Sequence, residues 1–599
     1  MENNATERLG RLRKLMNDKG IDAVIIPSAD PHQSEYLAPH WQVRKYLSGF
    51  TGSAGTLVVT KDKAALWTDS RYFIQAARQL RNTGIELMKD GLKDTPSIEE
   101  WIVYNLPEGG KVGIDGWLLT KDYATRLLEK IQHTSSDKIG LDFKFEVTDD
   151  VWTDRPSLPS SEAFIHDEEY AGESASSKIK SILEILKKEG AEGYLFTALD
   201  EIAWILNLRG SDVNCNPVNT AFLYISDKQN VLFIDSSKLT SRVIKYLEDN
   251  QIAVRDYFDL KEFLESSIGS SAIALDSSKT SLRIYDFLSE SPINLPSPAT
   301  LLKALKNDTQ IKGFREAMRR DGAALCYAFK EIEQRLEKGE KTTEIDVADI
   351  ILKHRKKQPL FFDESFATIS GYGPNGAIVH YTATPETDAT LARQGLLLVD
   401  SGAQYLDGTT DITRTISLGQ PTSDEKRDFT LVLKGMIALA SAVFPEGTRG
   451  VQLDVLAHQY LWRAGQNYLH GTGHGVGHFL NVHEGPQTIR NNNNETPLLP
   501  GMVTSDEPGL YKEGKYGIRC ENLILTIPVV IEGADSFRYL GFETLTLFPF
   551  DLSLIDEEIF TEADKLWLNS YHSRVYEELA PLLDEETKQW LKNKTLPIK

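Results

Sequence analysis

The chain has 599 residues, and its 66 Lys and Arg against 87 Asp and Glu give a formal net charge of −21. A chain this acidic repels nucleic acid and anionic membrane surfaces, so neither is expected as a partner. The length exceeds what a single hydrophobic core can fill, and several domains are therefore expected.

The cysteines and the amino terminus indicate in which compartment of the cell the protein is located. Cys215, Cys326 and Cys520 are an odd and widely spaced set, which argues against a disulfide framework and for a reducing environment. The first eight residues are polar and no apolar segment follows them, so a secretory signal is not expected. No apolar run reaches the ~18 residues that a membrane helix needs. We therefore expect a cytoplasmic protein.

Two segments in the first half of the chain repeat one design. Apolar residues recur at helical spacing over residues 6–19 and again over residues 176–189, and each run ends at a glycine. An apolar, strand-like segment follows each helix, at residues 21–27 and 193–197. A helix followed by a buried strand is typical of layered α/β structure, so we predict two copies of one α/β domain.

Clusters of proline and serine mark the expected limits of these domains. They occupy residues 155–161 and 291–298, and such clusters are typical of linkers. We therefore predict domains at residues 1–155, 156–305 and 306–599.

The third predicted domain is of the α+β type and alternates helices with strands that carry acidic residues. A long helix is expected at about 308–338, and a capping sequence at 343–346 opens another. Apolar segments at 396–400 and 409–413 predict a hairpin. A second capping sequence at 422–425 opens a helix at about 423–443. Further strands would carry the acidic residues near the end of the domain. This order suggests two half-domains that face each other.

Two aspartates belong to the predicted hairpin. Asp400 ends an apolar strand, where a buried carboxylate is unfavourable unless a cation or hydrogen-bond donors compensate it. A turn near Tyr405 places Asp411 beside Asp400. Two negative charges at such a short distance repel each other unless a metal ion neutralises them. The pair therefore predicts metal ligands.

The segment 470–483 contains four of the twelve histidines among closely spaced glycines. Glycine lets the backbone approach a bound ion closely, and we predict His474 as a metal ligand. His478 would share a face with His474 only in a helix, which the glycines disfavour, so it is left out of the ligand set. The segment lacks the Gly-Lys-Ser/Thr ending of a phosphate-binding loop.

Two glutamates complete the predicted ligand set. Pro508 favours an extended conformation for Glu507, although the neighbouring Asp506 is an equally acidic candidate. Glu521 follows Arg519 by two residues, so the two side chains would share one face of a strand. The arginine would then orient the carboxylate, or form an ordinary surface ion pair.

One imidazole and four carboxylates form a suitable ligand set for two divalent ions that share a water molecule. Hard oxygen ligands favour Mn²⁺, with Zn²⁺ and Co²⁺ as alternatives. Such a pair of ions activates water and polarises a carbonyl group, which indicates hydrolysis of an amide.

The order of these ligands carries a family resemblance. Asp, Asp, His, Glu and Glu follow one another as in the pita-bread metallopeptidases, which include methionine aminopeptidase, prolidase and Xaa-Pro aminopeptidase. The segments 470–477, 481–486, 48–55, 67–73 and 198–212 resemble the three-domain cytosolic Xaa-Pro aminopeptidases (aminopeptidase P), so the likeness covers nearly the whole chain. It implies two creatinase-like α/β domains followed by a pita-bread catalytic domain.

The resemblance implies a role for each predicted ligand. Asp400 would bind one ion, while Asp411 and Glu521 would bridge both. His474 and Glu507 would complete the shell of the second ion. Glu507 would also carry a proton from the bridging water to the leaving nitrogen.

Further residues are expected from the resemblance to contact or orient the substrate, namely His380, His483, His470, Arg71 and Arg519. Of these, His380 and His483 would stabilise the tetrahedral intermediate, and Arg71 would reach the substrate from the first domain. The role of His478 stays open.

The activity that the resemblance implies is release of the amino-terminal residue from peptides with proline in second position, by a homodimer. Prolidase, the nearest alternative, acts on dipeptides and usually has one accessory domain. A catalytically inactive peptide-binding protein is a second alternative, but the complete ligand set argues against it. The same set argues against creatinase-like chemistry, which proceeds without metals.

Overall fold

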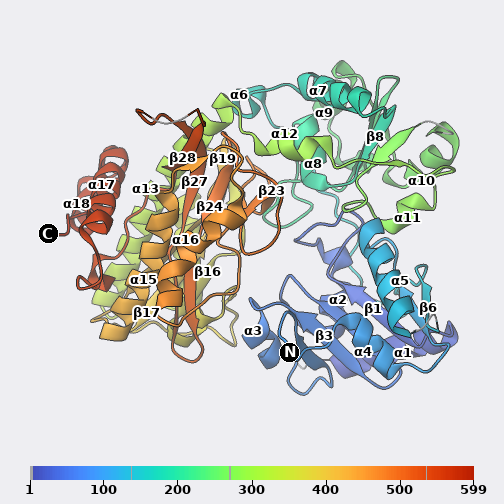
Figure 1. Ribbon diagram of the computed structural model, residues 1–599, viewed down its shortest axis with the longest axis horizontal. Helices are drawn as coiled ribbons and strands as arrows, with labels where there is room; N and C mark the ends of the chain where they lie inside the picture. Colours follow the sequence, from blue (N-terminus) through green and yellow to red (C-terminus); the bar gives the residue numbers. More distant parts are fainter. Residues whose placement is uncertain (1–3, 136–137, 269–271, 534–535) are drawn as a thin grey trace. The chain divides into compact units, whose positions relative to one another are not determined.

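A computed structural model describes residues 4–135, 138–268, 272–533 and 536–599 (Figure 1). The first three residues of the polar amino terminus therefore lie outside the described residues. The chain divides into two compact units. The first consists of residues 1–166 and 173–299, and the second of residues 167–172 and 300–599.

The first unit contains two six-stranded sheets, each of which forms a set with its own helices, and a short ladder of β7 (Phe164–Ile165) and β9 (Leu208–Arg209). The first set is β1 (Ala23–Pro27), β2 (Thr56–Thr60), β3 (Ala64–Thr68), β4 (Glu86–Lys89), β5 (Lys111–Ile114) and β6 (Gly140–Asp142), with α1 (Ala5–Asp18), α2 (Val43–Ser48), α3 (Phe73–Gln79), α4 (Ile98–Asn105) and α5 (Lys121–Ser135). The second set is β8 (Gly193–Phe196), β10 (Phe222–Ser226), β11 (Asn230–Phe233), β12 (Ile252–Arg255), β13 (Ile273–Leu275) and β14 (Ile293–Asn294), with α7 (Ala175–Lys188), α8 (Leu199–Leu206), α9 (Ser241–Asp249), α10 (Leu260–Phe263) and α11 (Leu282–Tyr285).

The two sheets have the same topology. Their strand orders are β4-β3-β2-β1-β5-β6 and β12-β11-β10-β8-β13-β14. In the first sheet β1 pairs antiparallel with β2 and parallel with β5. In the second, β8 pairs antiparallel with β10 and parallel with β13. This repeat confirms the predicted pair of α/β domains.

Burial explains why the predicted helices form. In α1 the residues Leu9, Leu12 and Met16 recur at helical spacing, and all three are buried in one cluster with Val24 of β1. The observed ends of α1, β1, α7 and β8 differ from the predicted ones by at most two residues. The limits predicted for the three domains stay predictions.

The second unit is built on several antiparallel ladders. One sheet has the order β16-β17-β20, from β16 (Ile369–Tyr372), β17 (Leu396–Ser401) and β20 (Ile412–Ser417). A larger sheet has the order β21-β28-β27-β24-β22-β23, from β21 (Phe444–Pro445), β28 (Tyr539–Thr544), β27 (Asn522–Val529), β24 (Val503–Asp506), β22 (Gly473–Gly475) and β23 (Glu484–Ile489). The smaller ladders consist of β15 (Phe361–Glu364), β18 (Ala403–Tyr405) and β19 (Gly408–Thr409), and of β25 (Gly509–Lys512) and β26 (Tyr516–Arg519).

Two helices of the second unit, α14 (Glu344–Arg355) and α15 (Ser423–Ala440), begin at the predicted capping sequences. The other helices include α13 (Asp308–Glu337), α16 (Gly450–Arg463), α17 (Glu562–Leu579) and α18 (Glu585–Lys594). Thr343 and Thr422 form capping boxes with Asp346 and Glu425, as predicted. The end of α15 at Ala440 lies three residues before the predicted one, because Ser441 already leaves the helical geometry.

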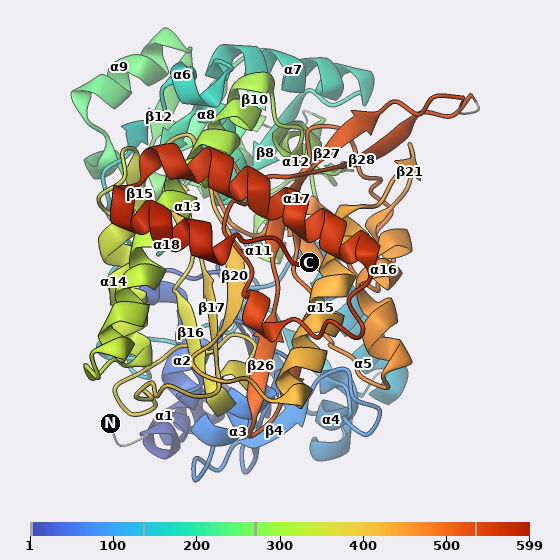
Figure 2. The same cartoon turned by 90° about the vertical axis from the view of Figure 1, so that its left-hand side faces the viewer.

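The last two helices lie side by side and pack against α13 (Figure 2). Leu568 and Leu579 of α17 and Leu591 of α18 are buried in one cluster with Phe329 of α13. Burying these side chains stabilises the carboxyl-terminal region against α13 by the hydrophobic effect.

A short helix of the first half of the sequence also belongs to the second unit. This helix, α6 (Glu168–Ala171), ends at Gly172, where φ is +72°. The side-chain amide of Asn307 donates to the carbonyl of Ala171 at 2.9 Å, and a Cβ on Gly172 would lie 2.5 Å from Asn307 Oδ1. Glycine is therefore needed at this position for both its conformation and its size.

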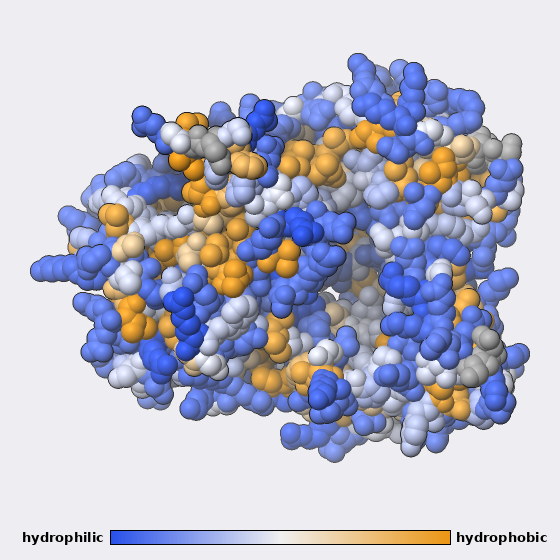
Figure 3. Space-filling model, viewed as in Figure 1, coloured by the Kyte–Doolittle hydropathy of each residue, from blue (hydrophilic) through white to orange (hydrophobic). Residues whose placement is uncertain are grey.

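The surface is mostly hydrophilic with scattered apolar patches, as Figure 3 shows for one face. This agrees with the excess of acidic residues in the sequence. Within the described ranges, no helix has both the length and the apolar character needed to cross a bilayer.

Candidate metal centre

Asp400 and Asp411 are brought together by the hairpin of β17 and β20. Asp400 lies in β17 and pairs with Thr413 of β20, so the strand register fixes its position. Asp411 directly precedes β20 and is 4% exposed. The hairpin is therefore formed as predicted, and it places two buried carboxylates close to each other.

His474 is the central residue of β22. Its Nδ1 lies 2.9 Å from the carbonyl of Gly475, which fixes the tautomer with the proton on Nδ1. Its Nε2 lies 3.4 Å from Asp411 Oδ2 and 3.4 Å from Glu507 Oε1. The imidazole lone pair therefore points into a group of carboxylates, as a metal ligand requires.

The glycines on either side of His474 are required by neighbouring backbone. A Cβ on Gly473 would lie 2.1 Å from the carbonyl oxygen of Ser505, and one on Gly475 would lie 2.3 Å from that of Glu484. Larger residues would separate the strands and displace the imidazole between them.

Glu507 and Glu521 lie between strands rather than within them, which corrects the expectation that strands carry them. Glu507 follows the last residue of β24, and Glu521 precedes the first residue of β27. Ser505 Oγ lies 3.2 Å from Glu507 Oε1, and Thr413 donates its hydroxyl to Glu521 Oε2 at 2.6 Å. Strand ends therefore aim both carboxylates at the space beside His474.

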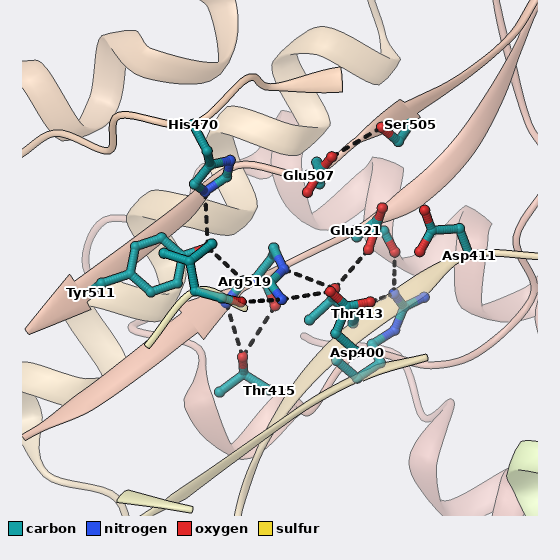
Figure 4. Close-up of polar contacts among 12 residues, drawn as sticks. Asp400, Asp411, Thr413, Thr415, His470, Ser505, Glu507, Tyr511, Arg519 and Glu521 are labelled. Atoms are coloured by element: carbon teal, nitrogen blue, oxygen red, sulfur yellow. Dashed lines mark hydrogen bonds and ion pairs between the residues drawn. The ribbon is translucent and has the colours of Figure 1, made fainter. Parts of the chain in front are cut away.

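The side chains converge on one site. Ligand atoms of Asp411, His474 and Glu521 all lie within 4.8 Å of one another. Figure 4 shows Asp411 beside Glu521, with Glu507 and Asp400 on either side of Glu521. The structure thus brings together the five residues proposed from the sequence as ligands.

The buried carboxylates of this cluster would be stabilised by bound cations. Burial raises the pKa of Glu507 to about 7 and that of Glu521 well above its usual range, and the charge of Asp411 adds to both shifts. Burial also raises the pKa of Asp400, whose Oδ1 is buried without a hydrogen bond among the described residues. Divalent ions would neutralise these carboxylates and supply the missing partner, so the residues fit a metal site.

His474 responds to the same negative charges. Burial alone lowers the pKa of its imidazole, but the hydrogen bond with Asp411 and the charge of Glu507 raise it to about 9. Without metal, a proton on His474 would take the place of a cation. Metal binding must therefore displace this proton.

Arg519 pairs with Asp400, at an Nη2 to Oδ2 distance of 2.5 Å. It also donates to Thr413 Oγ1 at 3.1 Å and to the Tyr511 hydroxyl at 2.7 Å (Figure 4). The sequence interpretation placed Arg519 on one strand face with Glu521, and this was wrong because β26 ends at Arg519 and β27 begins only at Asn522. The guanidinium orients a carboxylate, but a different one.

The predicted substrate histidines occupy three positions around the site. The ring of His483 lies edge-on to His474, with ring centroids 4.4 Å apart. His470 Nε2 lies 2.9 Å from the Tyr511 hydroxyl, and so connects to Arg519 through Tyr511. His380 follows Val379, whose carbonyl oxygen lies 3.4 Å from Arg519 Nη2.

Arg71 belongs to the first unit, where it forms a two-pronged pair with Asp69 at 2.8 Å from each carboxylate oxygen. Its predicted contact with substrate stays a prediction. His478 is separate from the ligand cluster because its ring packs against Phe314 of α13, with centroids 5.5 Å apart.

Thr413, Tyr511 and Ser505 support the site but were not singled out in the sequence. Thr413 contacts both Glu521 and Arg519, and Tyr511 contacts both Arg519 and His470. A hydroxyl two residues after Asp411 in a strand shares its face, and this spacing is the signal that could have indicated Thr413.

Comparison with known proteins identifies the family. A model of metallopeptidase family M24 matches residues 312–527, and the carboxyl-terminal region of peptidase M24 matches residues 538–598. Creatinase/prolidase N-terminal domains match residues 8–140 and 154–310.

Relatives match over almost the full length. Aminopeptidase P2 of Arabidopsis thaliana is 44% identical over 99% of this chain and 88% of the relative. A probable Xaa-Pro aminopeptidase P of Coprinopsis cinerea is 41% identical over 99% of this chain and 98% of the relative. A crystal structure of X-prolyl aminopeptidase from Caenorhabditis elegans, described as a cytosolic enzyme with a di-nuclear active site, is 35% identical with a TM-score of 0.95 and covers 99% of this chain and 100% of that one. The chain therefore belongs to metallopeptidase family M24, in its group of Xaa-Pro aminopeptidases.

Proposed function

We propose that the protein removes the amino-terminal residue from peptides whose second residue is proline. This proposal rests on the convergence of side chains at one site. They belong to Asp411, His474 and Glu521, with Asp400 and Glu507 beside them. The relatives that span the whole chain are aminopeptidases P, which supports the same reading.

The five clustered residues would hold two divalent ions. When bound, such ions lower the pKa of a shared water and polarise the substrate carbonyl. Four carboxylates and one imidazole favour Mn²⁺, with Zn²⁺ and Co²⁺ as alternatives. The crystal structure of the Caenorhabditis elegans relative, with its di-nuclear site, supports a pair of ions.

The chemistry of the substrate explains the need for this site. A peptide bond before proline is a tertiary amide without an N–H, so a peptidase cannot recognise it through that hydrogen. The leaving proline nitrogen must gain a proton as the bond breaks. Glu507, whose pKa burial raises to about 7 in the metal-free protein, would accept a proton from the attacking water and donate it to this nitrogen.

The surrounding residues would hold the substrate. His380 and His483 would donate hydrogen bonds to the oxygen on which negative charge develops. His470, Arg519 and Arg71 would complete the binding of the peptide. Arg519 would do so while it keeps Asp400 in place through their ion pair.

We also propose that the protein is a cytoplasmic homodimer, and that each chain has domains at residues 1–155, 156–305 and 306–599. The cytosolic location of the Caenorhabditis elegans enzyme supports the compartment, as does the absence of a disulfide among the three cysteines.

A tripeptide assay coupled to metal analysis tests the proposal. We expect release of arginine from Arg-Pro-Pro but not from Arg-Ala-Pro, with two metal ions for each chain. Activity should disappear on chelation and return on addition of Mn²⁺. Cleavage of Xaa-Pro dipeptides alone would instead identify a prolidase, and a metal-free protein without activity would indicate a peptide-binding relative.

A further inference from the structure

Arg414 holds the backbone on which Glu521 depends. It follows Thr413 in β20 and is 2% exposed. Its Nη1 donates to the carbonyl of Thr413 at 2.9 Å and to that of Glu521 at 2.5 Å. Thr413 in turn donates its hydroxyl to the Glu521 carboxylate at 2.6 Å. One guanidinium thus fixes both backbone positions that set this carboxylate.

The other donors of Arg414 reach the carboxyl-terminal region. They contact the carbonyl oxygens of Phe548 at 2.6 Å and Pro549 at 3.1 Å, and the hydroxyl of Tyr571 in α17 at 3.0 Å. The guanidinium also lies over the ring of Phe550, 3.8 Å from its centroid. Arg414 therefore links α17 to the residues around Glu521, together with the Tyr571 hydroxyl, which donates to Asn522 Oδ1 at 3.4 Å.

The partners of Arg414 are unusual for a buried cation. Its hydrogen bonds all end on neutral oxygens, and within the described residues no carboxylate lies at ion-pair distance from it. A buried charge without a counter-charge is unfavourable, so the guanidinium depends on this complete set of neutral oxygens.

We propose that Arg414 is a positioning residue of the metal centre, and that Tyr571 of α17 belongs to the same support. The inference rests on the proposed function, because it assigns these residues to the same ions. Arg414 fixes the backbone at Glu521 and Thr413, and Thr413 then fixes the carboxylate. The carboxyl-terminal helices therefore take part in metal binding although none of their side chains is a candidate ligand.

Two variants and a matched control test this proposal. Arg414→Lys keeps the positive charge but cannot reach all of these oxygens, and Tyr571→Phe removes one hydroxyl while keeping the ring. We expect Arg414→Lys to bind the more weakly held Mn²⁺ ion about tenfold to hundredfold more weakly in competition with a chelator. Tyr571→Phe should shift the affinity in the same direction by less. Tyr576→Phe, on the same helix and away from Arg414, should match the wild type.

The electron paramagnetic resonance spectrum supplies a readout independent of turnover. Wild-type protein should give the signal of two coupled Mn²⁺ ions, and Arg414→Lys should give isolated ions at the same metal concentration. Wild-type affinity and spectra in both variants, with only a lower melting temperature, would overturn the inference. If Arg414→Lys does not fold, the Mn²⁺ affinity of Tyr571→Phe alone tests the inference. A wild type that takes up none of Mn²⁺, Zn²⁺ and Co²⁺ would overturn the proposed function and this inference together.

Discussion

Arg519 and Asp400 form a buried ion pair with 2.5 Å between Nη2 and Oδ2, although 119 residues separate them in the sequence. The pair places one fixed positive charge beside a group of carboxylates. Because Asp400 is also a proposed ligand, the stability of the metal-free protein and its affinity for metal depend on the same contact.

Replacing Arg519 by Met should expose this dependence. Removal of one partner leaves an uncompensated buried carboxylate, which costs about 3–5 kcal/mol. We expect urea unfolding of the metal-free variant to show this loss, and Mn²⁺ to restore part of it by supplying positive charge. Arg315→Met is the control, since its pair with Glu543 is half-exposed and should contribute less than about 1 kcal/mol. Equal losses in the two variants would contradict the assigned role.

Glu507 and Asp506 can be distinguished by isosteric amides. Glu507→Gln should reduce kcat by about 10²–10⁴-fold, because it removes the proposed proton carrier. Asp506 is fully buried in β24, and neither of its carboxylate oxygens has a hydrogen-bond partner among the described residues, whereas Glu507 Oε1 lies 3.4 Å from His474 Nε2. Asp506→Asn should therefore keep most of the activity. Steady-state kinetics on Arg-Pro-Pro provide the measurement, and a larger loss in Asp506→Asn would reverse the assignment.

His478 should prove unnecessary for metal binding. Its ring packs against Phe314, so His478→Ala removes packing and should cost about 1–3 kcal/mol of stability. Metal analysis should find as many ions in this variant as in the wild type, whereas His474→Ala should lose at least one. Loss of an ion from His478→Ala would mean that a ligand has been misplaced.

His572 predicts a dependence of stability on pH that is separate from the active site. Burial, followed by the charge of Arg414, lowers the pKa of His572 to about 3, and its Nε2 accepts a hydrogen bond from the Phe550 amide at 3.1 Å. In the unfolded chain the pKa is about 6.5, so the unfolded state binds a proton first and stability falls as the pH drops below that value.

The size of this effect follows from the same two pKa values. Between pH 7 and pH 5 the loss from His572 should reach about 2 kcal/mol. His572→Gln keeps an acceptor for Phe550 and should remove this part of the pH dependence, as urea unfolding at pH 7 and pH 5 would show. The exposed His133, replaced by Gln, serves as the control. An unchanged pH dependence in His572→Gln would show that the imidazole already carries its proton in the folded protein.

Local patterns were sufficient to predict the elements and much of the site. The hairpin that joins Asp400 and Asp411 follows from two apolar segments and the turn between them. The capping residues Thr343 and Thr422 predicted where α14 and α15 begin, because the bonds of a helix start are made within a few residues.

These local patterns could not predict contacts between side chains that are far apart in the sequence. Nothing in the spacing of Arg519 indicates that Asp400, rather than Glu521, accepts its hydrogen bond, because the choice depends on how β17 and β26 pack together. The role of Tyr511 was missed for the same reason. Its hydroxyl joins Arg519 to His470 only after β25 and β26 have paired.

The placement of α6 has a practical consequence for anyone who divides this polypeptide. A fragment that starts at Thr300 would lack residues 167–172, although these belong to the same compact unit. The amide of Asn307, the residue that caps the start of α13, would then lose its acceptor on Ala171. An isolated peptidase half should therefore be engineered with this hexapeptide spliced ahead of it, since a cut at the apparent junction removes a piece of the half it is meant to release.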